Sequence, residues 1–341
     1  MRKICWPILL LLPWLSLAAS APRQVTFIST SDCHYREPDH PLGHHNDLNH
    51  ASLEEMNRIT AVNWPKKLGG GKIEPPRGVV VLGDLIDDGD RGTKERKNSE
   101  EQYRLFRADF GLDGTDGFLK YPVFEGWGNH DGPPEGKEKC GFSSQAQIKK
   151  RNQIRRQKGL ISNISDNGLH YSWDWDDVHF VHLNFYPADK QHAGVHYAPV
   201  WHDPQDALRF LKQDLAGKVG QSGRPVVLMA HCGFDTDWWV EEDWKETYAA
   251  AKEYNIVLYL YGHTGTGLRQ WAPAGETKKW DCINDGHTDA GFFVIQITGD
   301  RLRAGYRCKS GLKFAKDAAG VMRHTWTGTW EWKFPMEKEL K

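Results

Sequence analysis

The sequence lacks the features of a membrane-spanning or nucleic-acid-binding protein. Beyond its first residues it has no apolar run near the roughly 20 residues that a membrane-spanning helix needs. It also lacks an excess of one charge, because 44 Lys and Arg residues stand against 45 Asp and Glu residues, a formal net charge of -1. Such a chain has no general attraction for polyanions, so nucleic acid is not expected as its main partner.

Internal repeats and low-complexity linkers are missing as well. The content of 39% hydrophobic and 26% charged residues is ordinary for a soluble globular protein, which excludes a disordered chain. With 341 residues the chain is long enough to bury a large core. The length allows one sizeable domain or two modest ones. One domain of two stacked sheets with outer helices is expected, because it explains the strands and helices described below better than two separate domains.

The first 21 residues predict an export signal. Arg2 and Lys3 precede residues 4–19, which are apolar except for Ser16, and small residues follow at positions 18–21. This run is shorter than a membrane span, and small residues suit signal peptidase. An uncleaved anchor is the alternative. We expect a signal peptide at 1–21 and a secreted or otherwise extracytoplasmic mature chain at 22–341.

Cysteine is scarce, with six residues in all. Removal of Cys5 with the signal leaves five, so at least one thiol is unpaired or bonded to another molecule. Export to an oxidising compartment permits disulfides. Cys282 precedes a predicted strand and Cys308 ends its expected hairpin partner, so we predict a disulfide between these two.

Short apolar runs rich in β-branched and aromatic residues predict buried strands. They lie at residues 25–29, 78–82, 123–127, 226–230 and 256–261. Helical patterns occur between them at 51–62, 99–109, 206–215 and 244–254, and a solvated surface helix is expected within 140–159. Alternating strands and helices indicate an α/β fold. Four more predicted strands show a plainer alternation of apolar and polar residues, which favours a second, more antiparallel sheet. They lie at residues 169–175, 178–185, 291–298 and 302–309.

Polar residues follow each of the five buried strands. They are Asp32 and His34; Asp84 and Asp87; Asn129, His130 and Asp131; His231; and His263. Residues after the carboxyl ends of strands meet at one rim of an α/β sheet. In the D-x-H pair, strand alternation is expected to send Asp32 and His34 to the same side. Carboxylate, imidazole and amide oxygen suit Mn, Fe or Zn, and a carboxylate such as Asp84 can bridge two ions.

These blocks resemble the signature of the calcineurin-like metallophosphoesterase superfamily: D-x-H, G-D-x-x-D, G-N-H-D, H and G-H-x-x, in that order. The resemblance spans residue 25 to about residue 307. It implies two stacked mixed β-sheets flanked by helices, a four-layer sandwich, with a C-terminal extension. It also implies two divalent or trivalent metal ions and hydrolysis of phosphate esters by metal-bound hydroxide.

The resemblance further implies a role for each residue of the blocks. The first metal would be held by Asp32, His34 and Asp84, and the second by Asp84, Asn129, His231 and His263. His130 would act as general acid or charge stabiliser, oriented by Asp131. Asp87 would hold a ligand histidine rather than a metal.

The sequence departs from the family pattern at Gly265, where phosphodiesterase-type members have a histidine that binds the first metal. The first metal is then left with three protein ligands, unless His287 replaces the missing one. Two further expectations concern the surroundings of the site. The histidine-rich segment 44–50 is a candidate roof that contacts substrate, and Cys33 and Cys232 are expected to point away from the metals.

Three functions remain open at this point. The leading hypothesis is a secreted phosphomonoesterase, which the loss of a histidine at position 265 favours slightly. A phosphodiesterase of nucleotides or phospholipid head groups is the alternative within the same class. A non-catalytic, metal-binding interaction module is the third, and the intact Asn129-His130-Asp131 block argues against it.

Overall fold

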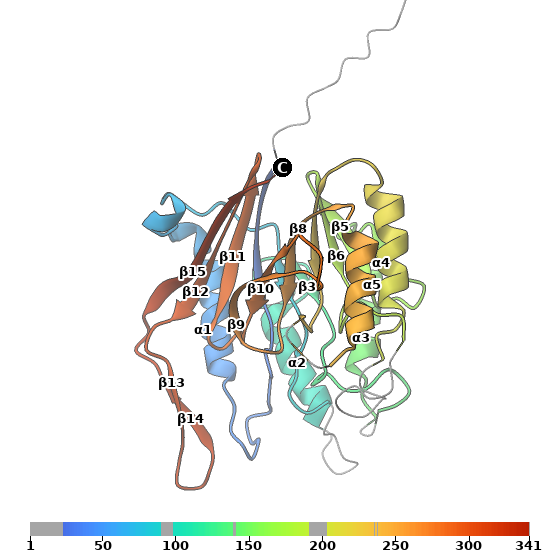
Figure 1. Ribbon diagram of the computed structural model, residues 1–341. Coiled ribbons are helices and arrows are strands. Elements are labelled where there is room, and N and C mark those ends of the chain that lie inside the picture. The colour runs from blue at the N-terminus through green and yellow to red at the C-terminus, as the bar shows by residue number, and fades with distance from the viewer. Residues whose placement is uncertain are drawn as a thin grey trace, which may run out of the picture.

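Buried runs of β-branched and aromatic residues form the centres of two sheets in the computed structural model. The structure describes residues 23–89, 98–138, 141–190, 203–234, 236 and 238–340. The predicted signal at 1–21, with Cys5, and Cys140 lie outside the described residues. The fold is α/β, with two mixed sheets and flanking helices, as predicted (Figure 1).

The first sheet has six strands in the order β15-β12-β11-β1-β2-β3. They are β1 (Gln24–Thr30), β2 (Val79–Val81), β3 (Val123–Glu125), β11 (Gly291–Thr298), β12 (Arg301–Lys309) and β15 (Trp330–Glu339). Strands β1, β2 and β3 are parallel, whereas β11, β12 and β15 add antiparallel neighbours on the other side of β1.

The second sheet has seven strands in the order β4-β5-β6-β7-β8-β10-β9. They are β4 (Asn163–Ile164), β5 (Tyr171–Trp175), β6 (Val178–His182), β7 (Pro225–Met229), β8 (Asn255–Tyr261), β9 (Thr266–Trp271) and β10 (Trp280–Asp285). Strands β6, β7, β8 and β10 run parallel, and both edges are antiparallel. A separate hairpin, β13 (Lys313–Lys316) and β14 (Met322–Thr325), follows β12.

The helices cover the outer faces of both sheets. They are α1 (Asn46–Asn57), α2 (Asn98–Phe110), α3 (Ser144–Gln157), α4 (Ala207–Asp214) and α5 (Glu241–Ala251), with a π-turn at Leu215–Val219 and 3-10 turns at Ile59–Ala61 and Lys66–Leu68. In Figure 1, α4 and α5 run side by side along the seven-stranded sheet, and α1 lies beside β11 and β12. In the described part of the chain, no helix has the length and hydropathy that crossing a membrane requires.

The core between the two sheets is rich in aromatic rings. Phe27 of β1 meets Phe180 of β6 edge-on at 5.2 Å between ring centroids, and Phe124 of β3 stacks on Trp173 of β5 at 4.3 Å. Successive residues of one strand face opposite layers, so Val80 points between the sheets while its neighbours point toward the helices. This packing fixes the two sheets face to face and aligns the ends of their parallel strands.

Two predictions about individual elements are wrong. The antiparallel strands do not form a sheet of their own, because β5 and β6 join one parallel core and β11 and β12 join the other. The helix within 140–159 is not simply a solvated surface helix. Arg151 and Arg155 of α3 are buried and both bind the buried carboxylate of Glu125 at the end of β3.

The predicted disulfide between Cys282 and Cys308 is also wrong. No bond joins these two buried thiols. Cys282 lies on β10 of the seven-stranded sheet, where its Sγ contacts the carbonyl of Trp280 at 3.6 Å. Cys308 lies on β12 of the other sheet, with its Sγ 3.8 Å from the carbonyl of Glu331. The two strands do not pair, and each thiol sits in the core of its own sheet.

Candidate metal centre

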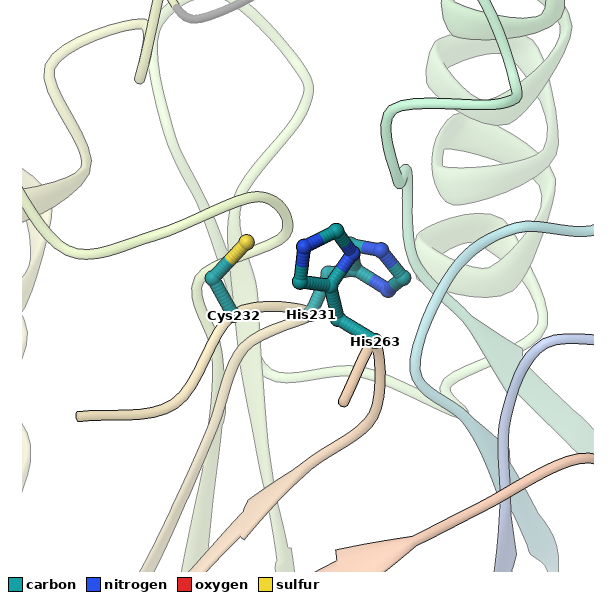
Figure 2. A group of neighbouring side chains, drawn as sticks. All are labelled: His231, Cys232 and His263. Carbon is teal, nitrogen blue, oxygen red and sulfur yellow. The ribbon is translucent and has the colours of Figure 1, made fainter. Parts of the chain in front are cut away.

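The predicted ligands come from loops at the carboxyl ends of parallel strands. In the first sheet, pairing continues past the strand ends, because Asp32 N donates to Gly83 O at 3.0 Å and His34 N donates to Asp84 O at 3.0 Å. The loop after β1 is thereby held against the loop after β2. In the second sheet, the loops after β7 and β8 carry His231 and His263, which Figure 2 shows lying side by side.

The loops that carry the ligands have an unusual backbone. Asp32, His34, Asp84 and His263 all have positive φ angles, at 50, 44, 53 and 69 degrees. The D-x-H pair is therefore not an extended segment. Its side chains do face the same side, as predicted, with 3.6 Å between His34 Nε2 and Asp32 Oδ1, but strand alternation is not the reason. Holding a non-glycine residue at a positive φ costs of order 1–3 kcal/mol of conformational free energy. Such strained residues are concentrated at functional sites.

Two glycines of the blocks are needed for close packing rather than for a turn. A Cβ at Gly128 would collide with the carboxylate of Asp84, and one at Gly262 would collide with the hydroxyl of Ser31. Without a side chain, Gly128 lets the loop that carries Asp84 come close, and Gly262 does the same for the loop that carries Ser31. The glycines therefore bring the ligand loops together, which is how the blocks converge on one place.

The first group of ligands surrounds Nε2 of His34. That nitrogen lies 3.6 Å from Asp32 Oδ1 and 3.8 Å from Asp84 Oδ2. The other ring nitrogen, Nδ1, lies 3.2 Å from Asp87 Oδ1, and Arg36 Nε donates to the second oxygen of Asp87 at 2.9 Å. Asp87 thus holds the ring of His34 and leaves Nε2 to face the two carboxylates. Arg36, which orients Asp87, carries no signal in the sequence that would have identified it.

The second group gathers around Nε2 of His231. Its Nδ1 donates to the carbonyl of Leu82 at 2.9 Å, so that in the neutral ring Nε2 presents a lone pair. That Nε2 lies 2.9 Å from Asn129 Oδ1 and 3.3 Å from Asp84 Oδ2. The ligand atoms of His231 and His263 lie within 4.8 Å of each other. Asp84 therefore contributes an oxygen to both groups.

The charges of the site favour bound cations. Burial opposes the charged forms, yet the neighbouring imidazoles, that of His231 above all, lower the pKa of Asp84 to about 2. Burial also acts to lower the pKa of His231, but the Asp84 carboxylate raises it to about 9. A buried carboxylate cluster thus stabilises positive charge at this point, and a metal can supply that charge in place of a proton.

The donor set fits a pair of metal ions. Once a metal displaces the proton of His231, three acceptor atoms converge on one small space: Asn129 Oδ1, Asp84 Oδ2 and His231 Nε2. Acceptors so close together repel each other unless a cation lies between them. The mix of imidazole nitrogen with carboxylate and amide oxygen is the borderline-hard set that Mn, Fe and Zn accept.

His130 lies beside the first group, where one of its ring nitrogens is within 4.8 Å of ligand atoms of His34 and Asp84. Its backbone N donates to Asp84 Oδ1 at 2.8 Å, and its ring nitrogen Nδ1 donates to the carbonyl of Asp87 at 2.9 Å. The ring meets that of His34 edge-on, with 4.6 Å between centroids. These contacts fix the orientation of the His130 ring and engage its Nδ1.

Asp131 has a different task from the predicted one. Its Oδ1 accepts hydrogen bonds from the backbone N of Leu85 at 2.9 Å and of Ile86 at 3.2 Å, and its Oδ2 accepts one from Gly128 N at 2.8 Å. With both carboxylate oxygens bound to backbone amides, Asp131 fastens the loop after β2 to the loop after β3. The partner that orients the His130 ring is the Asp87 carbonyl.

The two cysteines beside the ligands differ. Cys33 points away from the metal groups, as predicted, and its Sγ contacts Thr288 Oγ1 at 3.3 Å. Cys232 was expected to do the same, but its Sγ lies within 4.8 Å of ligand nitrogens of His231 and His263 (Figure 2). Because Cys232 follows His231 directly, a bend after β7 turns both side chains to one region. The expectation that Cys232 points away from the metals is therefore wrong.

A cavity of about 680 Å³ opens beside the first group. Asp32, His34 and His287 are among the residues that line it. It is also lined by Leu42 and His45 and by four residues of the β13–β14 hairpin: Phe314, Lys316, Gly320 and Met322. Of the histidine-rich segment 44–50, His45 therefore reaches the cavity, whereas His50 lies against Asp109, with 3.0 Å between His50 Nδ1 and Asp109 Oδ1. The sequence gave no indication of the hairpin's place.

Comparison with known proteins identifies one family. The family described as calcineurin-like phosphoesterase matches residues 25–266, which include the five sequence blocks. None of the curated proteins matches the sequence.

Comparison with solved structures gives matches at low sequence identity. Purple acid phosphatase PPD1 from yellow lupin (Lupinus luteus) is 13% identical, with a TM-score of 0.46 over 85% of this chain and 52% of the lupin chain. This chain thus spans about half the length of that phosphatase. GAP50, the anchor in the inner membrane complex of Plasmodium, is 11% identical, with a TM-score of 0.46 over 84% of this chain and 85% of its own. TT1561 of Thermus thermophilus is 12% identical, with a TM-score of 0.39 over 82% of this chain and 99% of its own.

Proposed function

Because the chain belongs to the calcineurin-like phosphoesterase family, whose members depend on a pair of metal ions, we propose that it hydrolyses phosphate monoesters. The observation that carries this proposal is the position of Asp84. Its Oδ2 lies 3.8 Å from His34 Nε2 and 3.3 Å from His231 Nε2, between two separate groups of ligands. A carboxylate shared in this way supports two metal ions held at a short separation.

Each group of the chain has a task in this reaction. Asp32, His34 and Asp84 would hold the first ion, and Asp84, Asn129, His231 and His263 the second. When bound, the ions polarise the phosphate and lower the pKa of a coordinated water toward roughly 7. His130, fixed by Asp84 and by the Asp87 carbonyl, presents Nε2 to donate a proton to the leaving oxygen.

The cavity favours a monoester over a diester. A phosphate monoester carries an additional negative charge near neutral pH, because its second pKa is about 6. Lys316 of the hairpin lines the same cavity as Asp32 and His34 and supplies a cation for that charge. Phe314 and Met322 add apolar surface on the same side, which suits an organic leaving group.

The proposal is tested by comparing two substrates with the same leaving group, p-nitrophenyl phosphate and bis(p-nitrophenyl) phosphate. We expect faster turnover of the monoester by protein loaded with Mn or Zn. Asp84→Asn is the matched control, because it keeps the shape of the side chain but removes the charge shared by both ions. It should reduce turnover by several orders of magnitude.

Each other result has a distinct meaning. Faster turnover of the diester supports a phosphodiesterase of nucleotides or phospholipid head groups. Two bound metals without turnover of either substrate support a non-catalytic interaction module. Wild-type activity in Asp84→Asn contradicts the whole assignment of the site.

The metals and the location of the enzyme are part of the same proposal. The ligands point to Mn, Fe or Zn, which elemental analysis of the purified protein would distinguish. The N-terminal signal points to secretion, and peptide mass analysis of the exported protein should find the first 18–21 residues removed. Retention of Met1 in the exported chain would contradict this.

A further inference from the structure

The first group of ligands has a gap at Gly265, and the backbone explains why a side chain is not found there. Gly265 has a φ angle of +127 degrees, a conformation that residues with a Cβ rarely adopt. Space is not the reason, since a Cβ at Gly265 would meet nothing within 4 Å. A histidine at this position would strain the loop after β8, so a fourth protein ligand has to come from another segment.

The segment that follows β10 runs directly beside this gap. Strands β9 and β10 pair antiparallel, with Thr266 opposite Asp285, so the next residue along β10, Gly286, comes level with Gly265. The approach is tight, because a Cβ at Gly286 would collide with the hydroxyl of Thr266. Residue 287 is therefore brought to the place where the missing ligand would stand.

The backbone around His287 is firmly attached to the loop after β1. Ser31 and His287 form a parallel bridge, and Thr288 N donates to Ser31 O at 2.9 Å. The Thr288 hydroxyl also donates to Ser31 O at 2.9 Å, and its carbonyl accepts a bond from Ser52 Oγ at 2.6 Å. These contacts fix the position of His287 relative to Asp32, the residue after Ser31.

The side chain of His287 faces the first group. Its ligand atom and those of Asp32 and His34 all lie within 4.8 Å of one another. Its ring stacks against that of His34, with 5.3 Å between centroids and 27 degrees between planes. His287 also lines the cavity, so an ion bound here would remain open to substrate on that side.

We propose that His287 is the fourth protein ligand of the first metal and replaces the histidine that the family has at position 265. This inference rests on the proposed function, because it assigns a residue to the same two-metal site. It changes the expectation that the first metal has three protein ligands. The first ion would be held by Asp32, His34, Asp84 and His287, and the second by Asp84, Asn129, His231 and His263, so that both sites have four.

The test is metal binding to the full mature chain, measured without any substrate. Metal-free wild-type protein is titrated with Mn²⁺ or Zn²⁺ by calorimetry, and bound metal is counted after dialysis. We expect two ions per chain. His287→Ala should keep one ion with unchanged affinity and bind the other at least about 10-fold more weakly, since even residues that only orient a ligand contribute 10- to 100-fold.

Two further variants control the experiment. His50→Ala removes a histidine that bonds to Asp109 outside both groups, and it should bind two ions like the wild type. His287→Glu offers an oxygen ligand from the same position, and it should hold the first ion better than His287→Ala. Cobalt-loaded protein adds a spectroscopic check, because loss of an imidazole ligand changes the visible absorption of one of the two ions.

The outcomes separate this inference from the proposed function. If the wild type binds two ions and His287→Ala binds both with wild-type affinity, the assignment of His287 is wrong while the two-metal site stands. If the wild type binds no ions, the proposed function fails and the inference fails with it. Equal weakening in His50→Ala and His287→Ala would also overturn the inference, because the effect would not belong to position 287.

Discussion

At the scale of single residues, neighbouring members of one sequence block have separate tasks. His130 and Asp131 are adjacent, yet His130 presents a ring nitrogen to the site whereas Asp131 binds three backbone amides behind it. Removing three hydrogen bonds from a buried carboxylate is costly, because buried donors are then left without partners. The two side chains therefore affect different properties of the protein.

The first prediction compares variants of this pair. His130→Ala should lower kcat by roughly 100-fold or more, the usual contribution of a proton donor, with little change in metal content or melting temperature. Asp131→Asn should lower the melting temperature, because an amide group cannot accept with both ends. Activity assays and thermal unfolding of both variants check this. A stable Asp131→Asn protein would contradict the role given to its carboxylate.

The second prediction concerns Lys309, a buried lysine that belongs to neither group of ligands. Lys309 is 4% exposed; its Nζ donates to Ser52 Oγ at 2.5 Å and lies 4.6 Å from the centroid of the Trp330 ring. Burial lowers the pKa of Lys309 to about 7. In the unfolded chain a lysine keeps its proton up to about pH 10.4. Between these values the unfolded state binds more protons, so this lysine makes the folded state more stable as pH rises.

Lys309→Met isolates that effect. We expect the unfolding free energy of the wild type, relative to the variant, to increase from about pH 7 to about pH 10. Urea unfolding of both proteins at several pH values in this range measures it. A difference that stays constant with pH would show that Lys309 titrates normally in the folded protein.

At the scale of elements, the β13–β14 hairpin has a clear boundary. Ser310 N donates to Thr329 O at 2.9 Å, so the two ends of the hairpin segment are already joined at its base. Beyond this bond the hairpin reaches the cavity through Phe314, whose ring lies 4.9 Å from that of His45. The hairpin touches the cavity but supplies no residue to the two groups of ligands.

The third prediction is that the hairpin serves substrate binding alone. Residues 311–328 are replaced by an Asn-Gly turn, which suits a two-residue connection between antiparallel strands. We expect KM for a phosphate monoester to rise several-fold, with a smaller change in kcat and with two metals still bound. Lys316→Ala should reproduce part of the rise in KM. Loss of metal on removing the hairpin would show that it supports the site rather than the substrate.

At the scale of the whole molecule, the site joins the two sheets. Asp32, Asp84 and Asn129 follow strands of the six-stranded sheet, and His231 and His263 follow strands of the other. Buried carboxylates that meet at this boundary repel each other unless a cation is bound. Metal binding should therefore stabilise the packing of the entire fold, since a ligand that binds only the folded state stabilises it.

The fourth prediction follows from this position between the sheets. Removal of metal by a chelator should lower the melting temperature by a few degrees or more, because 1 kcal/mol corresponds to about 2–4 °C for a domain of 150–250 residues. Added Mn or Zn should restore it. Asp84→Asn, which weakens both sites, should respond less to either treatment. Calorimetry with and without chelator measures the shift, and an unchanged melting temperature in the wild type would contradict the coupling.

The sequence by itself determined the fold class and which residues gather at the site. Runs of five β-branched or aromatic residues can hardly form anything except buried strands, and each was followed by a ligand type. Because parallel strands place their ends at one rim, order along the chain was enough to bring Asp32, Asp84, Asn129, His231 and His263 together. The family match over residues 25–266 agrees with that interpretation.

Only the tertiary structure decided matters that depend on which strands become neighbours. The alternating pattern of a strand does not show which sheet the strand joins, so β5 and β11 were grouped together although they lie in different sheets. Cys282 was paired with Cys308 because β10, which carries Cys282 into the other sheet, was not predicted. Positive φ angles at Asp32 and His34, and the bend that turns Cys232 toward His231, likewise arise from contacts between loops. His287 stands next to Asp32 because β10 pairs with β9 and Ser31 binds Thr288, and such long-range contacts leave no periodic pattern in the sequence.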